Sequence, residues 1–145
     1  MPKKLWLCLP PLVFSVTDVV VTLSEQPRAY WAGAFAEARE GAPQGYWLLS
    51  LHPLAYVAAA AVYVVLIAVL ILALPRLLAR VVSVGFALGH AWGISTWLDA
   101  DRPEGGAYWI ILGLFALGAG LIVTSMELAD ERPAPPPGPP AEAVH

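Results

Sequence analysis

Four long apolar runs constrain this chain more than any other feature. Each holds about 20 residues, which is enough for a helix to cross the hydrocarbon core of a bilayer. Of all residues, 59% are hydrophobic and 13% are charged, whereas a soluble domain has about 25% charged residues. Backbone polar groups in lipid must be satisfied within their own segment, so such runs form helices. The sequence predicts an all-α integral membrane protein with four transmembrane helices, at residues 5–23, 52–74, 81–98 and 107–126.

The loop at residues 24–51 is the longest connection, and its composition predicts structure of its own. Tyr30, Trp31 and Phe35 share one helical face, with charged residues mainly on the other side. This pattern predicts a short interfacial helix over about 28–40, lying flat at the outer membrane surface.

The remaining segments are short or lack apolar residues. They are the N-terminus at 1–4, a tight turn at 75–80, an acidic turn at 99–106 and the C-terminal segment at 127–145. Six of the eight residues from Pro133 to Pro140 are proline. A disordered or polyproline II tail is therefore expected.

Basic residues favour an orientation with both termini in the cytoplasm, because cytoplasmic loops carry an excess of Lys and Arg. In this arrangement five basic residues lie inside and three outside. The inside set is Lys3, Lys4, Arg76, Arg80 and Arg132, and the outside set is Arg28, Arg39 and Arg102. A small chain rich in Ala, Gly and Pro with a single Cys is typical of a bacterial-type cytoplasmic (inner) membrane.

The dipeptide Tyr-Trp occurs three times, each time where this topology places the outer interface. The copies are Tyr30-Trp31, Tyr46-Trp47 and Tyr108-Trp109. Amphipathic rings collect at headgroup depth. We expect these six residues to be interface anchors in contact with membrane lipid.

Asp18 is the single carboxylate inside the first apolar run. It shares a narrow polar face of the predicted helix with Ser15 and Thr22. A charge in hydrocarbon costs several kcal/mol, so this face is expected to turn toward protein or a water-filled cavity. Asp18 is either a proton, cation or ligand site, or a structural carboxylate bonded to a neighbouring side chain.

Gly85, Gly89 and Gly93 form two overlapping GxxxG patterns in the third run. Such a strip lets another helix approach closely, which predicts packing against the first helix and also a protein partner or a second copy. His90 and Trp97 lie in a row beside the strip.

Depth follows from counting residues at a rise of about 1.5 Å. On this count Asp18 lies about 21 Å from Lys4, and His90 lies about 14 Å from Val81, where the third run begins. Trp97 is therefore expected nearest to Asp18 in height, with His90 one to two turns lower.

Polar side chains gather in the outer half of the predicted bundle and suggest a ligand or ion site there. Its candidate residues are Asp18, Thr22, His52, His90 and Trp97. Two of them also fit structural roles, because His90 can bridge two helices as a neutral imidazole and His52 precedes Pro53 at the start of a helix.

Several functions are disfavoured. The net charge of −3 and the scattered basic residues leave no surface for nucleic acid. His52 and His90 differ too much in predicted depth to hold one haem, and no spacing typical of a metal site or a nucleophile motif occurs. No motif indicates a cofactor, and catalysis is not favoured.

Two functions remain. The first is a non-enzymatic accessory or scaffold subunit of a membrane complex, assembled through the glycine strip. The second is a ligand- or ion-binding protein, either for proton-coupled transport or with a quinol or lipid pocket, with its site around Asp18 and His90.

Overall fold

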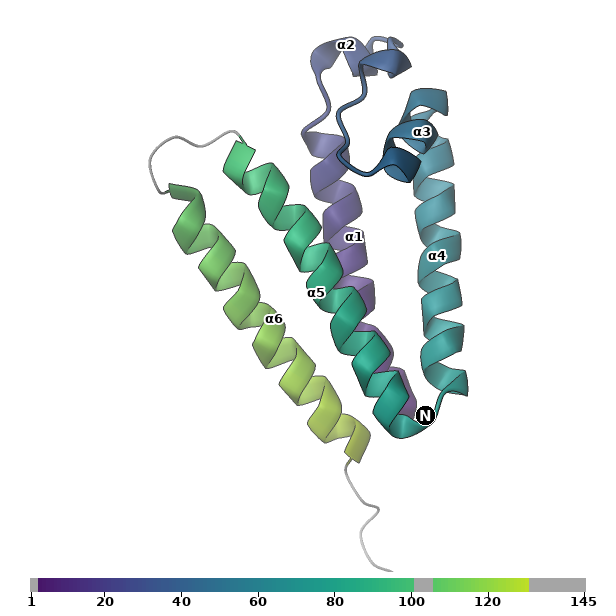
Figure 1. Ribbon diagram of the computed structural model, residues 1–145, viewed down its shortest axis with the longest axis vertical. Helices are drawn as coiled ribbons and strands as arrows, with labels where there is room; N and C mark the ends of the chain where they lie inside the picture. Colours follow the sequence, from purple (N-terminus) through teal and green to yellow (C-terminus); the bar gives the residue numbers. More distant parts are fainter. Residues whose placement is uncertain (1–2, 101–105, 131–145) are drawn as a thin grey trace, which may run out of the picture.

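The computed structural model describes the backbone of residues 3–100 and 106–130 (Figure 1). The helices are η1 (Lys3–Cys8), α1 (Leu9–Ser24), α2 (Arg28–Trp31), η2 (Phe35–Glu37), α3 (Pro43–Leu51), α4 (Pro53–Ala73), α5 (Arg76–Ala100) and α6 (Gly106–Asp130). No strand occurs in these two described ranges. The rest of the acidic turn and the proline-rich tail, for which disorder is predicted, lie outside the described residues.

Within the described part of the chain, four helical segments are long and apolar enough to cross a membrane. They are Lys4–Ser24, Pro53–Ala73, Arg76–Trp97 and Ile110–Asp130. The first joins η1 to α1, and Pro10 and Pro11 lie in the first turn of α1, where a missing N–H costs no helical hydrogen bond. The prediction of an all-helical protein with four potential spans is confirmed.

Two of the long helices extend past their apolar runs. α5 begins at Arg76, directly after Pro75 and five residues before the predicted start at Val81, and α6 continues to Asp130. Residues 127–130 therefore belong to a helix and not to the predicted tail. Helical hydrogen bonds join backbone groups and do not require apolar side chains, so a helix can continue past its apolar run. In these extensions Arg80 of α5 forms an ion pair with Asp130 of α6.

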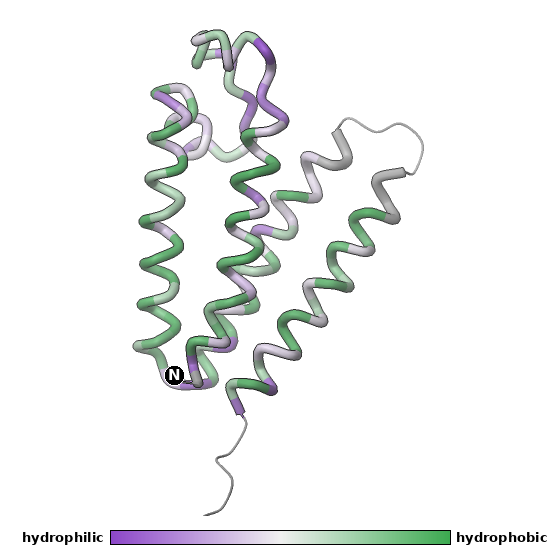
Figure 2. Tube along the Cα trace, turned by 180° about the vertical axis from the view of Figure 1, so that it is seen from behind, coloured by the Kyte–Doolittle hydropathy of each residue, from purple (hydrophilic) through white to green (hydrophobic). Residues whose placement is uncertain are grey.

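α1 and α5 form the centre of the bundle, with α4 on one side and α6 on the other (Figure 1). The loop between α1 and α4 covers the end opposite the N-terminus. Hydrophilic residues gather in this loop and at the N-terminal end, and the long helices between them are largely hydrophobic (Figure 2).

A row of small buried residues on α5 faces α1 and α6. It consists of Ala79, Ser83, Ala87 and Ala91, spaced four apart. Ser83 Oγ donates a hydrogen bond of 2.6 Å to the carbonyl of Leu7, and Phe14 packs against Ala87 and Ala91. Small residues at this spacing allow close helix contact in a membrane protein.

The glycine strip does not make the predicted contact with the first helix along its length. A Cβ added at Gly85 or Gly89 would meet no atom within 4 Å, whereas one at Gly93 would lie 3.0 Å from Oδ1 of Asp18. α1 docks mainly through the Ala and Ser row instead. That row allows close approach as glycine does, and its residues lose less backbone entropy in a helix.

The loop forms a compact cap and not one continuous interfacial helix over 28–40. Gly33, at a φ of 103°, separates α2 from η2, a conformation that only glycine adopts without strain. Gln26 links the two ends of the segment at 22–39 by hydrogen bonds. Its Nε2 donates to the carbonyls of Thr22 and Arg39 at 2.8 and 2.7 Å, and its Oε1 accepts from the Arg39 N–H at 2.8 Å.

Tyr30 is a core residue of this cap and not the predicted interface anchor. Its side chain is 0% exposed, and its hydroxyl donates to the Leu49 carbonyl at 3.2 Å. Burial raises the pKa of this phenol, which therefore remains a donor. Trp31, Tyr46 and Trp47 are exposed, as anchors require. The side chains of the third Tyr-Trp pair, Tyr108 and Trp109, lie outside the described part.

Candidate functional site

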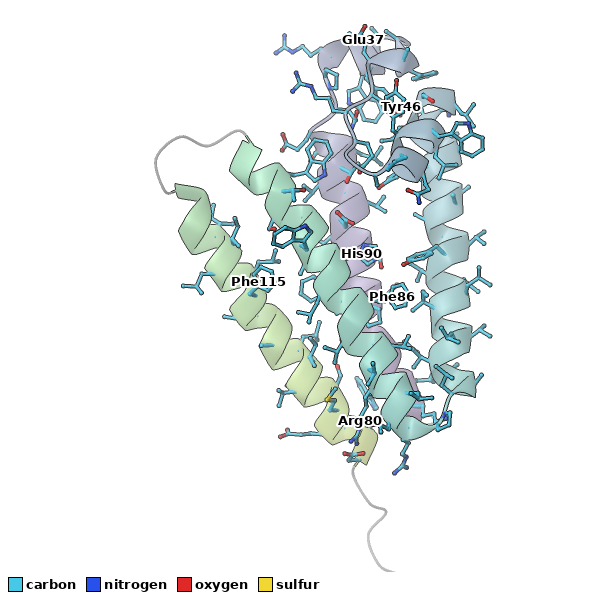
Figure 3. All side chains as sticks on the ribbon, viewed as in Figure 1. Glu37, Tyr46, Arg80, Phe86, His90 and Phe115 are labelled. Atoms are coloured by element: carbon cyan, nitrogen blue, oxygen red, sulfur yellow. The ribbon has the colours of Figure 1, made fainter. Side chains whose placement is uncertain are left out.

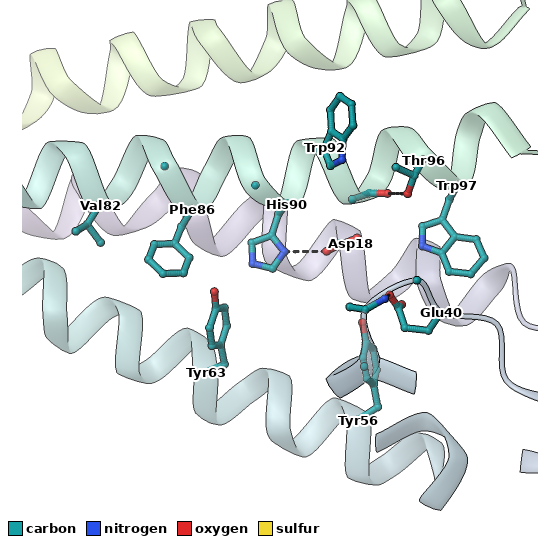
Figure 4. Close-up of a pocket in the computed structure, with 16 residues that line it drawn as sticks. Asp18, Glu40, Tyr56, Tyr63, Val82, Phe86, His90, Trp92, Thr96 and Trp97 are labelled. Carbon is teal, nitrogen blue, oxygen red and sulfur yellow. Dashed lines mark hydrogen bonds and ion pairs between the residues drawn. The ribbon is translucent and has the colours of Figure 1, made fainter. Parts of the chain in front are cut away.

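A cavity of about 930 Å³ lies between α4 and α5, and Asp18 of α1 contributes to its wall. Side chains of both helices point into it, among them Phe86 and His90 of α5 (Figures 3 and 4). Gly85 and Gly89 also line it, so the open face of the glycine strip is part of the cavity wall.

Asp18 and His90 form a hydrogen bond inside this cavity. Oδ2 of Asp18 lies 2.8 Å from Nδ1 of His90, and the two side chains are 19% and 20% exposed. Where the carboxylate is ionised it only accepts hydrogen bonds, and Nδ1 of His90 is then the donor. Its second ring nitrogen lies on the side facing Tyr63 (Figure 4).

Gly93 makes room for this carboxylate. A Cβ at position 93 would lie 3.0 and 3.1 Å from the two oxygens of Asp18. A hydrogen in place of that methyl group allows Asp18 to lie against the backbone of α5. Gly93 therefore allows α1 to approach α5 closely, as predicted for the glycine strip. The group that it accommodates is the side chain of Asp18 and not the backbone of α1.

The early start of α5 explains why His90, and not Trp97, meets Asp18. Measured from Arg76, His90 is 14 residues into its helix, and Asp18 is 14 residues from Lys4. At a rise of about 1.5 Å per residue both lie about 21 Å from the same end of the bundle. The predicted depth of His90 was wrong because it was counted from Val81.

Aromatic rings cover the cavity wall on both sides of the pair. Tyr63 of α4 packs edge-on against Phe86 and His90, with ring centroids 5.6 and 5.9 Å apart. Tyr56 of α4 and Trp97 of α5 line the cavity toward the loop. Asp18 lies between these two aromatic groups (Figure 4).

Glu40 is a second carboxylate at the cavity that the sequence analysis missed. It reaches the wall from the loop, and its Oε1 accepts a hydrogen bond of 2.9 Å from the Ala42 N–H. A Cβ at Gly45 would lie 2.7 Å from Cγ of Glu40, so Gly45 leaves the space that this side chain occupies. No local pattern marks Glu40, because its position depends on the Gln26 contact that folds the loop back.

Two predicted site residues lie away from the cavity wall. Thr22 is buried next to the cap, and its carbonyl accepts from Gln26. His52 caps the N-terminus of α4, where its Nδ1 accepts from the Leu54 N–H at 3.1 Å and its ring packs on Phe35. The structure therefore brings together Asp18, His90 and Trp97 and places His52 in the alternative role at the start of a helix.

The side chains around this cavity are suited to binding a ligand. Within the described residues no three His, Cys, Asp or Glu side chains converge as ligands for a metal ion. The Asp18 and His90 pair offers hydrogen-bond acceptors and a proton that the two groups can share, and the surrounding rings offer flat apolar surface.

Comparison with protein families, with curated proteins and with solved structures finds no match to this chain.

Proposed function

We propose that this protein is an integral membrane protein that binds a small ligand in the cavity around Asp18 and His90. The observation that carries the proposal is the 2.8 Å hydrogen bond between these two side chains at the wall of a cavity of about 930 Å³. Ionisable residues within membrane spans are costly and are retained mainly where they serve a function. Proton-coupled transport and a quinol or lipid pocket are the activities that fit such a site.

Native mass spectrometry of the protein, purified from its own host in mild detergent, tests this proposal. Its ultraviolet and visible spectrum is recorded on the same sample. We expect a bound small molecule that is lost in Asp18→Asn and retained in Glu25→Gln. The control removes an exposed carboxylate from the end of the same helix. Wild-type protein that retains a partner protein but no small molecule would contradict ligand binding.

The open face of the glycine strip supports a second candidate, the accessory or scaffold subunit. Gly85 and Gly89 have no atom within 4 Å of an added Cβ, so a helix of a partner or of a second copy has room to approach them. Under this proposal Gly89→Leu abolishes assembly in the same mass spectra. Under the ligand-binding proposal it only reduces the volume of the cavity.

The proposed orientation places both termini in the cytoplasm of a bacterial-type inner membrane, with the loop outside. At the N-terminal end, Lys4 Nζ donates to the carbonyls of Leu72 and Leu74 at 3.2 and 2.7 Å, and Arg76 and Arg80 belong to the same end. This positive end supports a cytoplasmic location. A reporter fused to the C-terminus tests it, and a reporter active only outside would contradict it.

A further inference from the structure

We infer that the cavity binds a lipophilic organic cation, held between the carboxylate of Asp18 and the aromatic rings of α4 and α5. This inference rests on the proposed ligand-binding function and assigns the chemical class of its ligand.

The charge of the cavity favours a cation. Asp18 and Glu40 both contribute to its wall, and among the described residues no Lys or Arg does. With a neutral imidazole, His90 donates a hydrogen bond to Asp18 but leaves the pair with one negative charge. Charges interact more strongly in a medium of low dielectric constant than in water, so this wall attracts cations and repels anions.

Aromatic rings supply the second element of cation recognition. The faces of Trp and Tyr attract ammonium-type cations, and Trp does so most strongly. Trp97 and Tyr56 lie on one side of Asp18, and Tyr63 and Phe86 lie on the other (Figure 4). A cationic centre near Asp18 would therefore have aromatic rings on both sides.

The dimensions of the cavity fit a bulky organic ion better than a metal ion. Its volume of about 930 Å³ lies in the range of small-molecule sites, about 300–1,000 Å³. Gly85 and Gly89 form a stretch of wall without side chains, which leaves space for apolar groups of the ligand. A small inorganic cation would leave most of this volume unfilled and would require more oxygen ligands than Asp18 supplies.

Two ions of the same shape and opposite charge test the inference. Tetraphenylphosphonium and tetraphenylborate are titrated into the purified full-length protein by calorimetry, with empty micelles as the reference. We expect the cation to bind at least about tenfold more tightly than the anion, because like charges at a site of low dielectric constant repel. Equal binding, or tighter binding of the anion, would overturn the inference.

Variants then assign the effect to the carboxylates. Asp18→Asn is expected to weaken binding of the cation about tenfold, and Glu40→Gln about threefold because Glu40 lies in the more exposed loop. Their matched controls, Glu25→Gln and Glu37→Gln, remove exposed carboxylates outside the cavity and leave binding unchanged. Glu40→Gln keeps the acceptor for Ala42 N–H, so it reports on charge even if Asp18→Asn does not fold. Cation binding that survives both cavity substitutions unchanged would contradict the assignment.

Different results would contradict the cation inference alone and the proposed ligand binding as a whole. If the small molecule that copurifies with wild-type protein is neutral or anionic and is lost in Asp18→Asn, the cavity is a ligand site and the cation inference is wrong. If wild-type protein retains no small molecule and binds neither probe, both proposals are wrong.

Discussion

The two sides of α5 show that free volume alone does not mark a candidate site. Toward α4, the helix lines a cavity in which Asp18, Glu40 and His90 meet aromatic rings. Toward α6, it borders a second cavity of about 290 Å³, and every described residue that lines this one is apolar. In a membrane, acyl chains or another helix can cover an apolar gap of this kind. Among the residues that the structure describes, those on the α4 side combine volume with groups that can select a ligand, and those on the α6 side do not.

Substitutions in the row of small buried residues on α5 are expected to destabilise the protein more than substitutions on the side that faces α4. Ala79 is fully buried among Leu7, Ile71 and Ala129, so Ala79→Leu should lower the free energy of unfolding by about 2–3 kcal/mol through overpacking. Gly85→Ala, six residues away on the side facing α4, meets no atom within 4 Å and should raise the free energy of unfolding by about 0.5–1 kcal/mol. Thermal unfolding in detergent measures both. A loss of stability in Gly85→Ala as large as that in Ala79→Leu would show that the glycine face is packed.

The pair on the cavity side is expected to contribute less to stability than the packed row. A double-mutant cycle of Asp18→Ala and His90→Ala should give a coupling free energy of about 1.5 kcal/mol, a value typical of a hydrogen bond to a charged group. Chemical unfolding of the two single variants and the double variant measures it. Additivity within about 0.3 kcal/mol would mean that the two side chains do not interact in the folded protein.

A substitution in the loop cap should destabilise only its surroundings. The cap covers one end of the bundle, where the cavity wall includes Glu40. Gln26→Leu removes three hydrogen bonds, to Thr22 and Arg39, at a cost of about 1 kcal/mol or more. Amide hydrogen exchange should become faster at Arg39 and its neighbours and stay unchanged in α6. Faster exchange throughout the chain would contradict a local role.

The smallest effect on stability is expected where the start of α5 meets the end of α6. Arg80 and Asp130 form an ion pair whose side chains are 32% and 48% exposed. Arg80→Gln should therefore cost about 0.5 kcal/mol, and the difference should shrink further in high salt. A loss that persists at high salt would indicate a role for Arg80 beyond this pair.

The sequence was sufficient to predict the four long helices, since apolar length alone decides which segments can lie in hydrocarbon. It also selected Asp18 and His90, because an acid or an imidazole within such a run must face protein or water. It did not predict their contact, since the start of α5 at Arg76 is set by Pro75 and lies outside the apolar run.

Contacts between residues far apart in the chain account for the other differences. Glu40 reaches the cavity because Gln26 binds Arg39, 13 residues away, and Tyr30 is buried because it meets Leu49. Ala and Ser at positions 79, 83, 87 and 91 repeat every four residues as the glycines do. Small residues of any of these three types at that spacing predict packing, so the sequence also contains the signal for the Ala and Ser row.

Cysteine accessibility in native membranes tests most directly whether α5 has one face that water reaches, toward α4, and one buried face, at Ala87. Gly89→Cys and Ala87→Cys are compared in a Cys8→Ser background, with a small water-soluble methanethiosulfonate reagent. We predict that Gly89→Cys reacts at least about tenfold faster, because a reagent must reach a thiol to modify it, and that tetraphenylphosphonium slows this reaction. Equal rates, or faster reaction of Ala87→Cys, would contradict the cavity between α4 and α5 on which both proposals rest.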